Sequence, residues 1–281
     1  MPTQPPAAEP RPDVPWRRYV AIGDSFTEGL WDGDDQTGVK GWADRLAAAL
    51  SARRVAAGQP PIEYANLAIR GRLARPIIAE QLGPALALKP DLVSLVGGGN
   101  DALRVTTDVN GIVALLDQAV AKLRAAGADV ILANSADPVN SPIIKLTRGR
   151  VATLYNSIWS LGRRHGAYVV DLWGMKSLLD WRLWCRDRIH LTSEGHRRVA
   201  NAALVALGLG PDDPDWDTPL PPRPAQTWQD QLAWNAQWAK EELVPWMVRH
   251  FKGQSSGDGR GPKRPWPLPI DPAPAVGPPL I

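Results

Sequence analysis

Short apolar runs alternate with longer segments of helical periodicity along most of the chain, and this alternation limits the possible folds more than any other feature. The apolar runs are rich in β-branched residues and have the length of buried strands: Tyr19 to Ile22, Ile62 to Leu67, Leu92 to Val96, Val130 to Ala133 and Tyr168 to Leu172. Segments with apolar residues every three or four positions lie at about 41–57, 76–88, 110–126, 143–165 and 193–207. Such alternation is typical of a parallel sheet with helices on both faces and right-handed crossovers. The sequence therefore predicts a three-layer α/β/α fold with a five-stranded parallel sheet.

Polar residues follow three of these apolar runs directly. Ser25 comes after the first run, in GDSFTEG, and Gly71 comes after the second, in NLAIRG. The third run is followed by GGGND, which ends at Asn100 and Asp101. In open α/β sheets the functional groups gather at the carboxyl ends of the strands. We therefore expect these three segments to meet at one edge of the sheet.

A serine at the end of a strand is either a turn residue or a nucleophile, and a nucleophile needs a base that takes its proton. The chain has four histidines that could serve. His165 precedes Gly166 at the end of an expected helix, where a helix cap explains it. His196 and His250 fall within expected helices among polar residues, and we expect both on solvated faces.

The remaining histidine, His190, lies in CRDRIHLTSEGH, with Asp187 three residues before it and Thr192 in position to cap the next helix. Two groups three residues apart in a turn can face the same way, so the Asp187 carboxylate can orient the imidazole. This spacing arises often by chance. Its interpretation as part of a catalytic site therefore depends on whether the chain also supplies hydrogen-bond donors for an oxyanion.

Acyl transfer places negative charge on a carbonyl oxygen, and one well-placed donor stabilises the transition state by roughly 3 to 4 kcal/mol. Gly71 has no side chain to block its N–H, Asn100 offers an amide, and the N–H of Ser25 would be a third donor. Alternatively, Gly71 is a turn glycine and GGGND is a flexible connector or a phosphate-binding loop. The two glycine-rich nucleotide signatures are absent from the sequence, which argues against the phosphate loop.

Four sequence blocks together resemble the SGNH hydrolases, also called the GDSL lipase/esterase family. They occur in the order of the family's own blocks: GDSFTEG at 23–29, NLAIRG at 66–71, GGND at 98–101 and DRIH at 187–190. The resemblance extends from residue 18 to about residue 207 and implies a flavodoxin-like SGNH hydrolase fold. The chain departs from the family by placing Arg72 and Arg75 after the second block, and Leu191 where a proline often follows the histidine.

The resemblance implies a serine hydrolase that cleaves the acyl esters of small molecules. Ser25, Asp187 and His190 would be its catalytic triad. The N–H groups of Ser25 and Gly71 and the side-chain amide of Asn100 would form its oxyanion hole. Such an enzyme uses no metal and no organic cofactor.

Other acidic residues and the single cysteine are interpreted as structural. Asp24 and Asp101 lie in the same blocks, and we expect them to fix the loop backbone, because a carboxylate aimed at the oxyanion would oppose catalysis. DGDD at 32–35 lacks the glycine and the distal glutamate of a calcium loop. Cys185 is the only cysteine, so the chain can form neither an internal disulfide nor a cysteine-based zinc cluster.

Several functions stay open at this point. The same site would serve a lipase or arylesterase, a carbohydrate O-deacetylase or an acyl thioesterase. An α/β-hydrolase is disfavoured, because it needs a G-x-S-x-G elbow and Thr27 occupies the second of its glycine positions. An alternative of another class is a non-catalytic binding or scaffold protein that uses the Trp-rich C-terminal helix.

Composition divides the chain into four parts. We expect a Pro-rich disordered N-terminus at 1–15, the hydrolase domain at 16–210, a Pro-rich linker and a Trp-rich helix packed on the domain at 211–252, and a Gly/Pro-rich disordered tail at 253–281. The net charge is only +3 and no long basic run occurs, which argues against a nucleic-acid partner. No signal peptide and no apolar stretch of about 18 residues is evident, so we expect a cytoplasmic protein without stable membrane insertion. The sequence predicts nothing about the oligomeric state.

Overall fold

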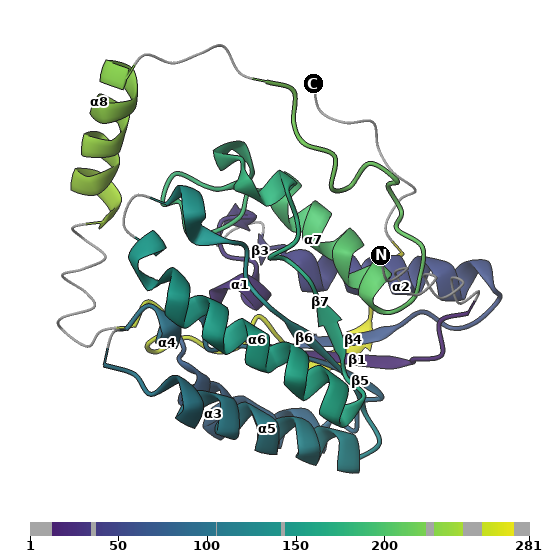
Figure 1. Cartoon of the computed structure of the whole chain (residues 1–281). Helices are drawn as coiled ribbons and strands as arrows, with labels where there is room; N and C mark the ends of the chain where they lie inside the picture. The colour runs from purple at the N-terminus through teal and green to yellow at the C-terminus, as the bar shows by residue number, and fades with distance from the viewer. Residues whose placement is uncertain are drawn as a thin grey trace, which may run out of the picture.

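A computed structural model describes residues 13–34, 38–104, 106–141, 144–222, 228–243 and 255–272. Within these residues a six-stranded sheet of order β7-β6-β5-β1-β4-β8 forms the centre of the molecule (Figure 1). Its parallel strands are β1 (Arg18–Gly23), β4 (Glu63–Asn66), β5 (Leu92–Val96), β6 (Asp129–Ala133) and β7 (Tyr168–Val170). Each of them lies within one of the predicted apolar runs or extends it by one residue at one or both ends. The predicted three-layer α/β/α fold is thereby confirmed.

Helices cover both faces of the sheet. Helices α2 (Trp42–Ala56) and α7 (Ser193–Ala206) pack on one face, and α3 (Ala74–Ala87), α5 (Val109–Ala125) and α6 (Arg148–His165) on the other (Figure 1). The side chains of β1 alternate between two apolar cores, with Tyr19 on the side of α2 and α7 and Val20 on the side of α3, α5 and α6. Burial on both faces explains why the strands of the parallel sheet appear in the sequence as unbroken apolar runs.

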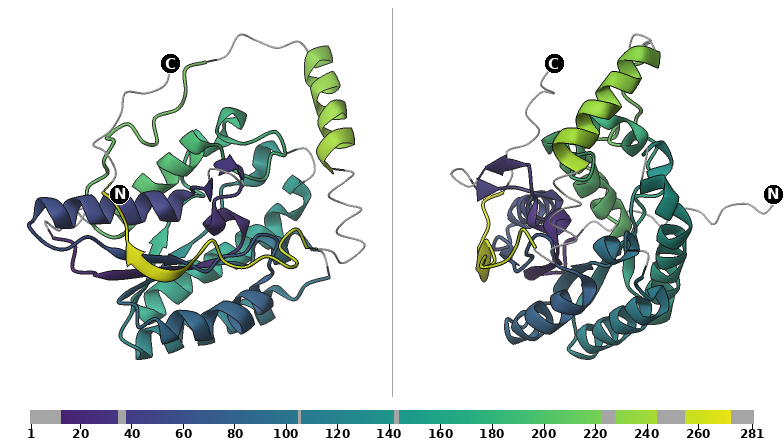
Figure 2. Two further views of the ribbon diagram at one scale, coloured as in Figure 1. Left: turned by 180° about the vertical axis from the view of Figure 1, so that it is seen from behind. Right: turned by 90° about the vertical axis from the view of Figure 1, so that its left-hand side faces the viewer.

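The predicted strand count is wrong by one. Strand β8 (Arg264–Pro269) adds to the outer edge of β4 in the antiparallel direction, and it belongs to the tail for which we expected disorder. Residues 255–272, here called the C-terminal strap, run along this edge of the sheet (Figure 2).

The composition of the strap misleads because its prolines follow the period of a strand. Residues 265, 267 and 269 are prolines, whereas the N–H of Ile270 donates to the carbonyl of Ile62. Proline has no backbone N–H, and the N–H groups of a strand alternate between its two sides. The three positions without an N–H therefore all lie on the outer side of β8, away from β4. Proline is tolerated there, and it prevents a further strand from pairing with the edge.

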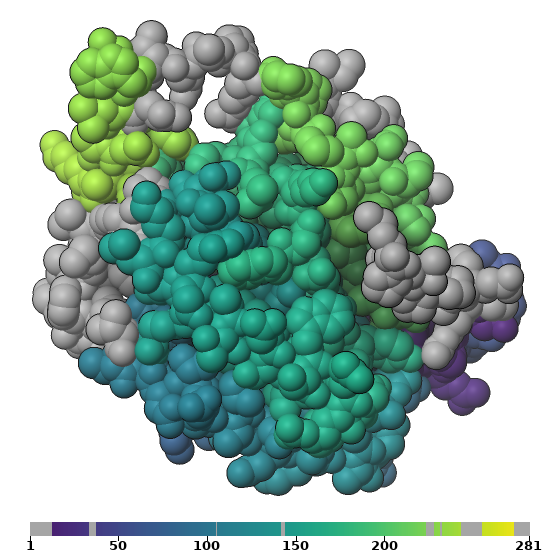
Figure 3. Space-filling view, in the orientation of Figure 1, coloured from purple at the N-terminus to yellow at the C-terminus, as the bar shows by residue number. Residues whose placement is uncertain are grey.

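The Trp-rich segment forms α8 (Trp228–Trp238), which continues as the π-helical turn η5 (Ala239–Leu243). Trp238 is 6% exposed against the domain, whereas Trp228 is 70% exposed and Leu232 is also exposed. The helix therefore contacts the domain through its C-terminal half, and it projects from the surface in the space-filling view (Figure 3). Pro245, at which the sequence predicts a kink or a break in this helix, lies outside the described residues. No described helix is both long enough and apolar enough to span a membrane.

Candidate active site

Ser25 is the first residue of a one-turn helix, α1 (Ser25–Glu28), which begins directly after β1. Asp24 caps this helix, because its carboxylate accepts the N–H of Phe26 at 3.1 Å. The chain leaves the turn through Gly29, whose φ of 90° is left-handed. The N–H of a first helical residue has no partner within the helix. Ser25 therefore presents both a hydroxyl and a backbone donor at the end of the central strand.

The structure brings His190 and Asp187 to this serine, as the block spacing predicts. His190 Nε2 lies 2.9 Å from the Ser25 hydroxyl oxygen, and His190 Nδ1 lies 2.5 Å from Asp187 Oδ2. The other carboxylate oxygen accepts the N–H groups of Ile189 and His190, both at 3.0 Å. Burial alone would raise the pKa of Asp187, but the hydrogen bonds with His190 and with the backbone hold that pKa below its usual range. The aspartate is thus held as a carboxylate.

Two local features position the turn that carries Asp187 and His190. Arg188 has a left-handed φ of 57°, which closes the turn and brings the following N–H groups onto the carboxylate. A bridge between Trp184 and Leu191 joins the two sides of the loop. Thr192 then begins α7 by accepting the N–H of Gly195 at 3.3 Å, so the predicted helix cap is present.

Asn100 lies in α4 (Gly99–Ala102), directly after β5, and its amide points at the nucleophile turn. The amide nitrogen donates to Asp24 Oδ2 at 3.2 Å and to the carbonyl of Arg72 at 3.1 Å. Burial raises the pKa of Asp24 to about 6. The carboxylate of Asp101 accepts the N–H of Ala74 at 2.8 Å, which fixes the first turn of α3. Both aspartates thus bond to loop groups that surround the serine.

Gly71 lies in the turn between β4 and α3, with a left-handed φ of 73°. A Cβ at this position would lie 2.5 Å from Ser255 Oγ of the strap, so both the backbone conformation and the close approach require glycine. Among the described residues, the N–H of Gly71 has no hydrogen-bond acceptor. The glycine is not among the residues that line the cavity at Ser25. The structure thus brings Ser25, Asp187, His190 and Asn100 together, and places Gly71 beside the strap.

The other two described histidines, His165 and His196, are bonded to residues other than Ser25. The expectation that His196 is solvated is wrong: it is 1% exposed, its Nδ1 accepts the N–H of Trp42, and burial lowers its pKa to about 3. It is buried because α7 packs against α2 at this position. His165 ends α6 and pairs with Asp117 at 2.5 Å. His250 lies outside the described residues.

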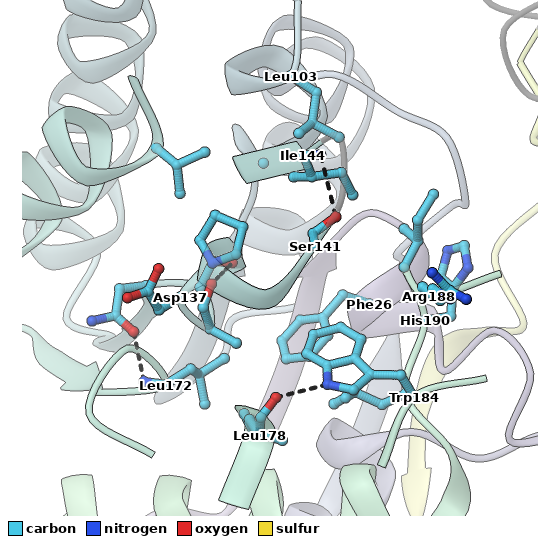
Figure 4. Close-up of a pocket in the computed structure, with 18 of the residues that line it drawn as sticks. Phe26, Leu103, Asp137, Ser141, Ile144, Leu172, Leu178, Trp184, Arg188 and His190 are labelled. Carbon is cyan, nitrogen blue, oxygen red and sulfur yellow. Dashed lines mark hydrogen bonds between the residues drawn. The ribbon is translucent and has the colours of Figure 1, made fainter. Parts of the chain in front are cut away.

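A cavity of about 190 Å³ opens beside Ser25 and His190 (Figure 4). Its lining is mostly apolar and aromatic and includes Phe26, Ile144, Tyr155, Leu172, Leu178 and Trp184. Much of this wall comes from the irregular segments 134–141 and 172–191. Sequence reasoning missed it, because residues in loops and short 3₁₀ turns leave no periodic pattern.

Comparisons with known proteins agree with this geometry. Residues 21–198 match the GDSL-like lipase/acylhydrolase family. No match was found among curated proteins. The solved structures that resemble the chain include LAE5, an alpha/beta hydrolase enzyme from the metagenome of Lake Arreo in Spain. It is 26% identical, with a TM-score of 0.59 over 68% of this chain and 95% of that one.

Two further solved structures share the fold at lower identity. Axe2, an acetylxylan esterase from Geobacillus stearothermophilus, is 20% identical, with a TM-score of 0.56 over 69% of this chain and 94% of that one. TesA is 22% identical, with a TM-score of 0.54 over 68% of this chain and 98% of that one. At these identities the likeness concerns the fold alone.

Proposed function

Because the chain belongs to the GDSL-like lipase/acylhydrolase family and is an ester-cleaving hydrolase, we propose that it cleaves carboxylic esters through an acyl-enzyme formed on Ser25. One observation carries the proposal. The Ser25 hydroxyl, the His190 imidazole and the Asp187 carboxylate form a continuous hydrogen-bonded series, with distances of 2.9 and 2.5 Å. A non-catalytic scaffold would gain nothing from this arrangement.

The reaction proceeds in two stages. Ser25 Oγ attacks the ester carbonyl while its proton passes to His190 Nε2, and Asp187 stabilises the resulting imidazolium. The tetrahedral intermediate collapses, the alcohol leaves with the proton from His190, and the acyl group stays on Ser25. A water molecule then attacks the acyl-enzyme, with His190 again as the base. The carboxylic acid leaves and the serine hydroxyl is restored.

The oxyanion is stabilised by the N–H of Ser25 and by the amide of Asn100. Both hydrogens of that amide are engaged in the free enzyme, one by Asp24 and one by the carbonyl of Arg72. The oxyanion therefore takes the place of the Arg72 carbonyl, whereas the bond to Asp24 keeps the amide oriented. Gly71 would be the third donor, as the family resemblance implies, once the turn that contains it faces the substrate.

The substrate proposed here carries an apolar acyl group. The apolar lining of the cavity next to Ser25 supports this choice over a carbohydrate O-deacetylase, whose substrate would need many polar partners. Arg70 in the second block and Arg72 directly after it do not indicate an anionic substrate. Arg70 is buried and pairs with Glu28 at 2.6 Å, and Arg72 pairs with Glu80 at 3.0 Å. An acyl thioesterase with the same acyl group remains the alternative.

The domain that carries this chemistry extends, in our proposal, from residue 16 to residue 272. The support is that β8 pairs with β4, and that Lys263 of the strap donates to the carbonyl of Glu28 in α1. A boundary at residue 210 would remove a strand of the sheet.

The proposal is tested with para-nitrophenyl esters from acetyl to decanoyl, acetylated xylo-oligosaccharides and acyl thioesters. Ser25→Ala should lower kcat by about 10⁴-fold or more at an unchanged melting temperature, and a fluorophosphonate should label Ser25 alone. Full activity in that variant, or labelling of another serine, would refute the acyl-enzyme. Faster turnover of the acetylated sugars or of the thioesters than of every para-nitrophenyl ester would show that the substrate belongs to that other class.

A further inference from the structure

The turn between Asp187 and His190 is bonded to α8 at two consecutive residues. The carbonyl of Asp187 accepts the indole N–H of Trp238 at 3.2 Å. Arg188 Nη1 donates to the side-chain carbonyl of Asn235 at 2.7 Å. Trp238 and Asn235 are three positions apart and so share one face of the helix. A helix outside the family match at 21–198 thus contacts the catalytic turn directly.

The strongest contact is aromatic. The Arg188 guanidinium lies 3.6 Å from the ring centroid of Trp234, 4.6 Å from that of Trp238 and 5.5 Å from that of Trp181. The arginine is 4% exposed, and within the described residues its Nε and Nη2 have no hydrogen-bond partner. Burial lowers its pKa to about 10, so it remains a cation at neutral pH. The faces of the indole rings are therefore the main stabilisation of this buried charge.

A further contact is exposed and weaker. Arg186 pairs with Glu241 and, at 3.5 Å, with Glu242 of η5, but its side chain is mostly exposed. Ion pairs of this kind contribute little in water. The aromatic contacts of Arg188, and not these charges, would therefore hold the turn against the helix.

Arg188 also has the least favourable backbone conformation of the turn. A left-handed φ of 57° is costly for a residue with a long side chain, and such conformations persist only where the surroundings enforce them. This conformation brings the N–H groups of Ile189 and His190 onto Asp187 Oδ1. If Arg188 relaxed to a negative φ, the carboxylate and the imidazole would move apart.

We propose that the indoles of Trp234 and Trp238 hold Arg188 in its left-handed conformation, and that α8 is thereby a positioning element for Asp187 and His190. The inference rests on the proposed function of the same site. Trp234 and Trp238 are positioning residues, because they act on the reaction through Arg188 and the turn that carries it. The helix stabilises the active arrangement relative to a relaxed one, and its removal would reduce turnover without removing any reacting atom.

The test compares two tryptophans of the same helix in the full-length protein. Trp238→Ala removes both the stacking and the bond to Asp187, whereas Trp228→Ala changes a residue that is 70% exposed and serves as the matched control. We expect Trp238→Ala to lower kcat on a short-chain ester by about 10- to 100-fold, with a nearly unchanged KM. Labelling of Ser25 by a fluorophosphonate should slow by a similar factor. Trp238→Phe, which keeps an aromatic face, should lose less activity.

A second substitution separates positioning from a loss of folding. Glycine adopts a left-handed φ without strain, so Arg188→Gly should leave the turn less dependent on the helix. The loss caused by Trp238→Ala should then be several-fold smaller in the Arg188→Gly background than in the wild type, as a double-mutant cycle measures. A reduced melting temperature with no such rescue would indicate a merely structural role and overturn the proposal.

Further outcomes distinguish a failure of the positioning role of α8 from a failure of the proposed acyl-enzyme mechanism. Wild-type kcat and labelling rate in Trp238→Ala, or an equal loss in Trp228→Ala, would refute positioning by α8 and leave the acyl-enzyme intact. Retained turnover in Ser25→Ala would instead refute the acyl-enzyme, whatever the helix variants do.

Discussion

The amide nitrogen of Asn100 lies 3.2 Å from a carboxylate oxygen of Asp24, so the residue before the nucleophile holds the side chain that we assign to the oxyanion hole. Asp24 also caps α1 through the N–H of Phe26. One buried carboxyl group thus joins the nucleophile turn to the segment that follows β5. Its burial raises its pKa to about 6, and this has a consequence for stability.

The contribution of Asp24 to the stability of the protein should fall as the pH rises from about 4 to about 6, whereas the buried His196, whose pKa is lowered to about 3, contributes in the opposite direction. The pKa of Asp24 is higher in the folded protein than in the unfolded chain, so protonation of this group favours folding. Its contribution is fully present below the unfolded pKa and is lost as the pH rises through the folded one. A shift of roughly two units corresponds to about 3 kcal/mol. Asp101 shifts in the same direction and adds to the effect.

Asp24→Asn should remove the part of this pH dependence that belongs to Asp24. Urea unfolding of both proteins at several pH values between 4 and 8 measures it. The variant should also turn over more slowly, because an amide has one acceptor oxygen and cannot accept both the Phe26 N–H and the Asn100 amide, as the two carboxylate oxygens of Asp24 do. Identical pH dependence in the two proteins would contradict the assignment.

The thiol of Cys185 should be unusually slow to react. Burial raises its pKa to about 11, and its Sγ lies 3.3 Å from the carbonyl of Leu191. The thiolate is the reactive species, so alkylation at pH 8 should be about 100-fold slower than for an exposed cysteine. The rate of iodoacetamide labelling, followed by mass spectrometry against a cysteine-containing peptide, measures this. Reaction as fast as that of the peptide would show the thiol to be accessible.

The sequence predicts how the residues of the site are arranged, but it predicts less of what packs around them. Strand β5 occupies the same residues as the predicted run at Leu92–Val96, because a strand buried on both faces has a plain apolar signature. The meeting of Ser25, Asn100 and His190 follows from their places at strand ends and before α7. These predictions depend on local patterns and on the topology of a parallel sheet.

The features that the sequence does not predict arise from tertiary packing. His196 is buried by α2, which is distant in the chain. Strand β8 has a composition typical of disorder and becomes ordered by pairing with β4. The cavity wall at Trp184 comes from a segment without a regular period, and Arg188 packs against indoles of α8, a helix that is distant from it in the chain. For each of these, the decisive partner lies many residues away.

Enlarging a side chain in the cavity should change the acyl preference. Ala136 lines the cavity and is buried, so Ala136→Phe would fill space that a long acyl group needs. The kcat/KM for an octanoyl ester should fall by about 10-fold or more, whereas the value for an acetyl ester should change little. Val139→Phe, at an exposed position three residues further, is the control. Equal losses for both esters would show that the cavity does not hold the acyl group.

The strap should stabilise the nucleophile turn through Lys263. Its ammonium group donates to the carbonyls of Glu28 and Val39 at 2.5 and 2.9 Å, and to the carboxylate of Asp44 at 2.6 Å. Lys263→Met keeps the length of the side chain but leaves these acceptors without their donor, which should cost about 2 to 4 kcal/mol of unfolding free energy. Lys122→Met, at an exposed position of α5, should change the free energy of unfolding by less than about 0.5 kcal/mol. Equal urea midpoints for the two variants would show that the strap is not needed for the stability of the sheet edge.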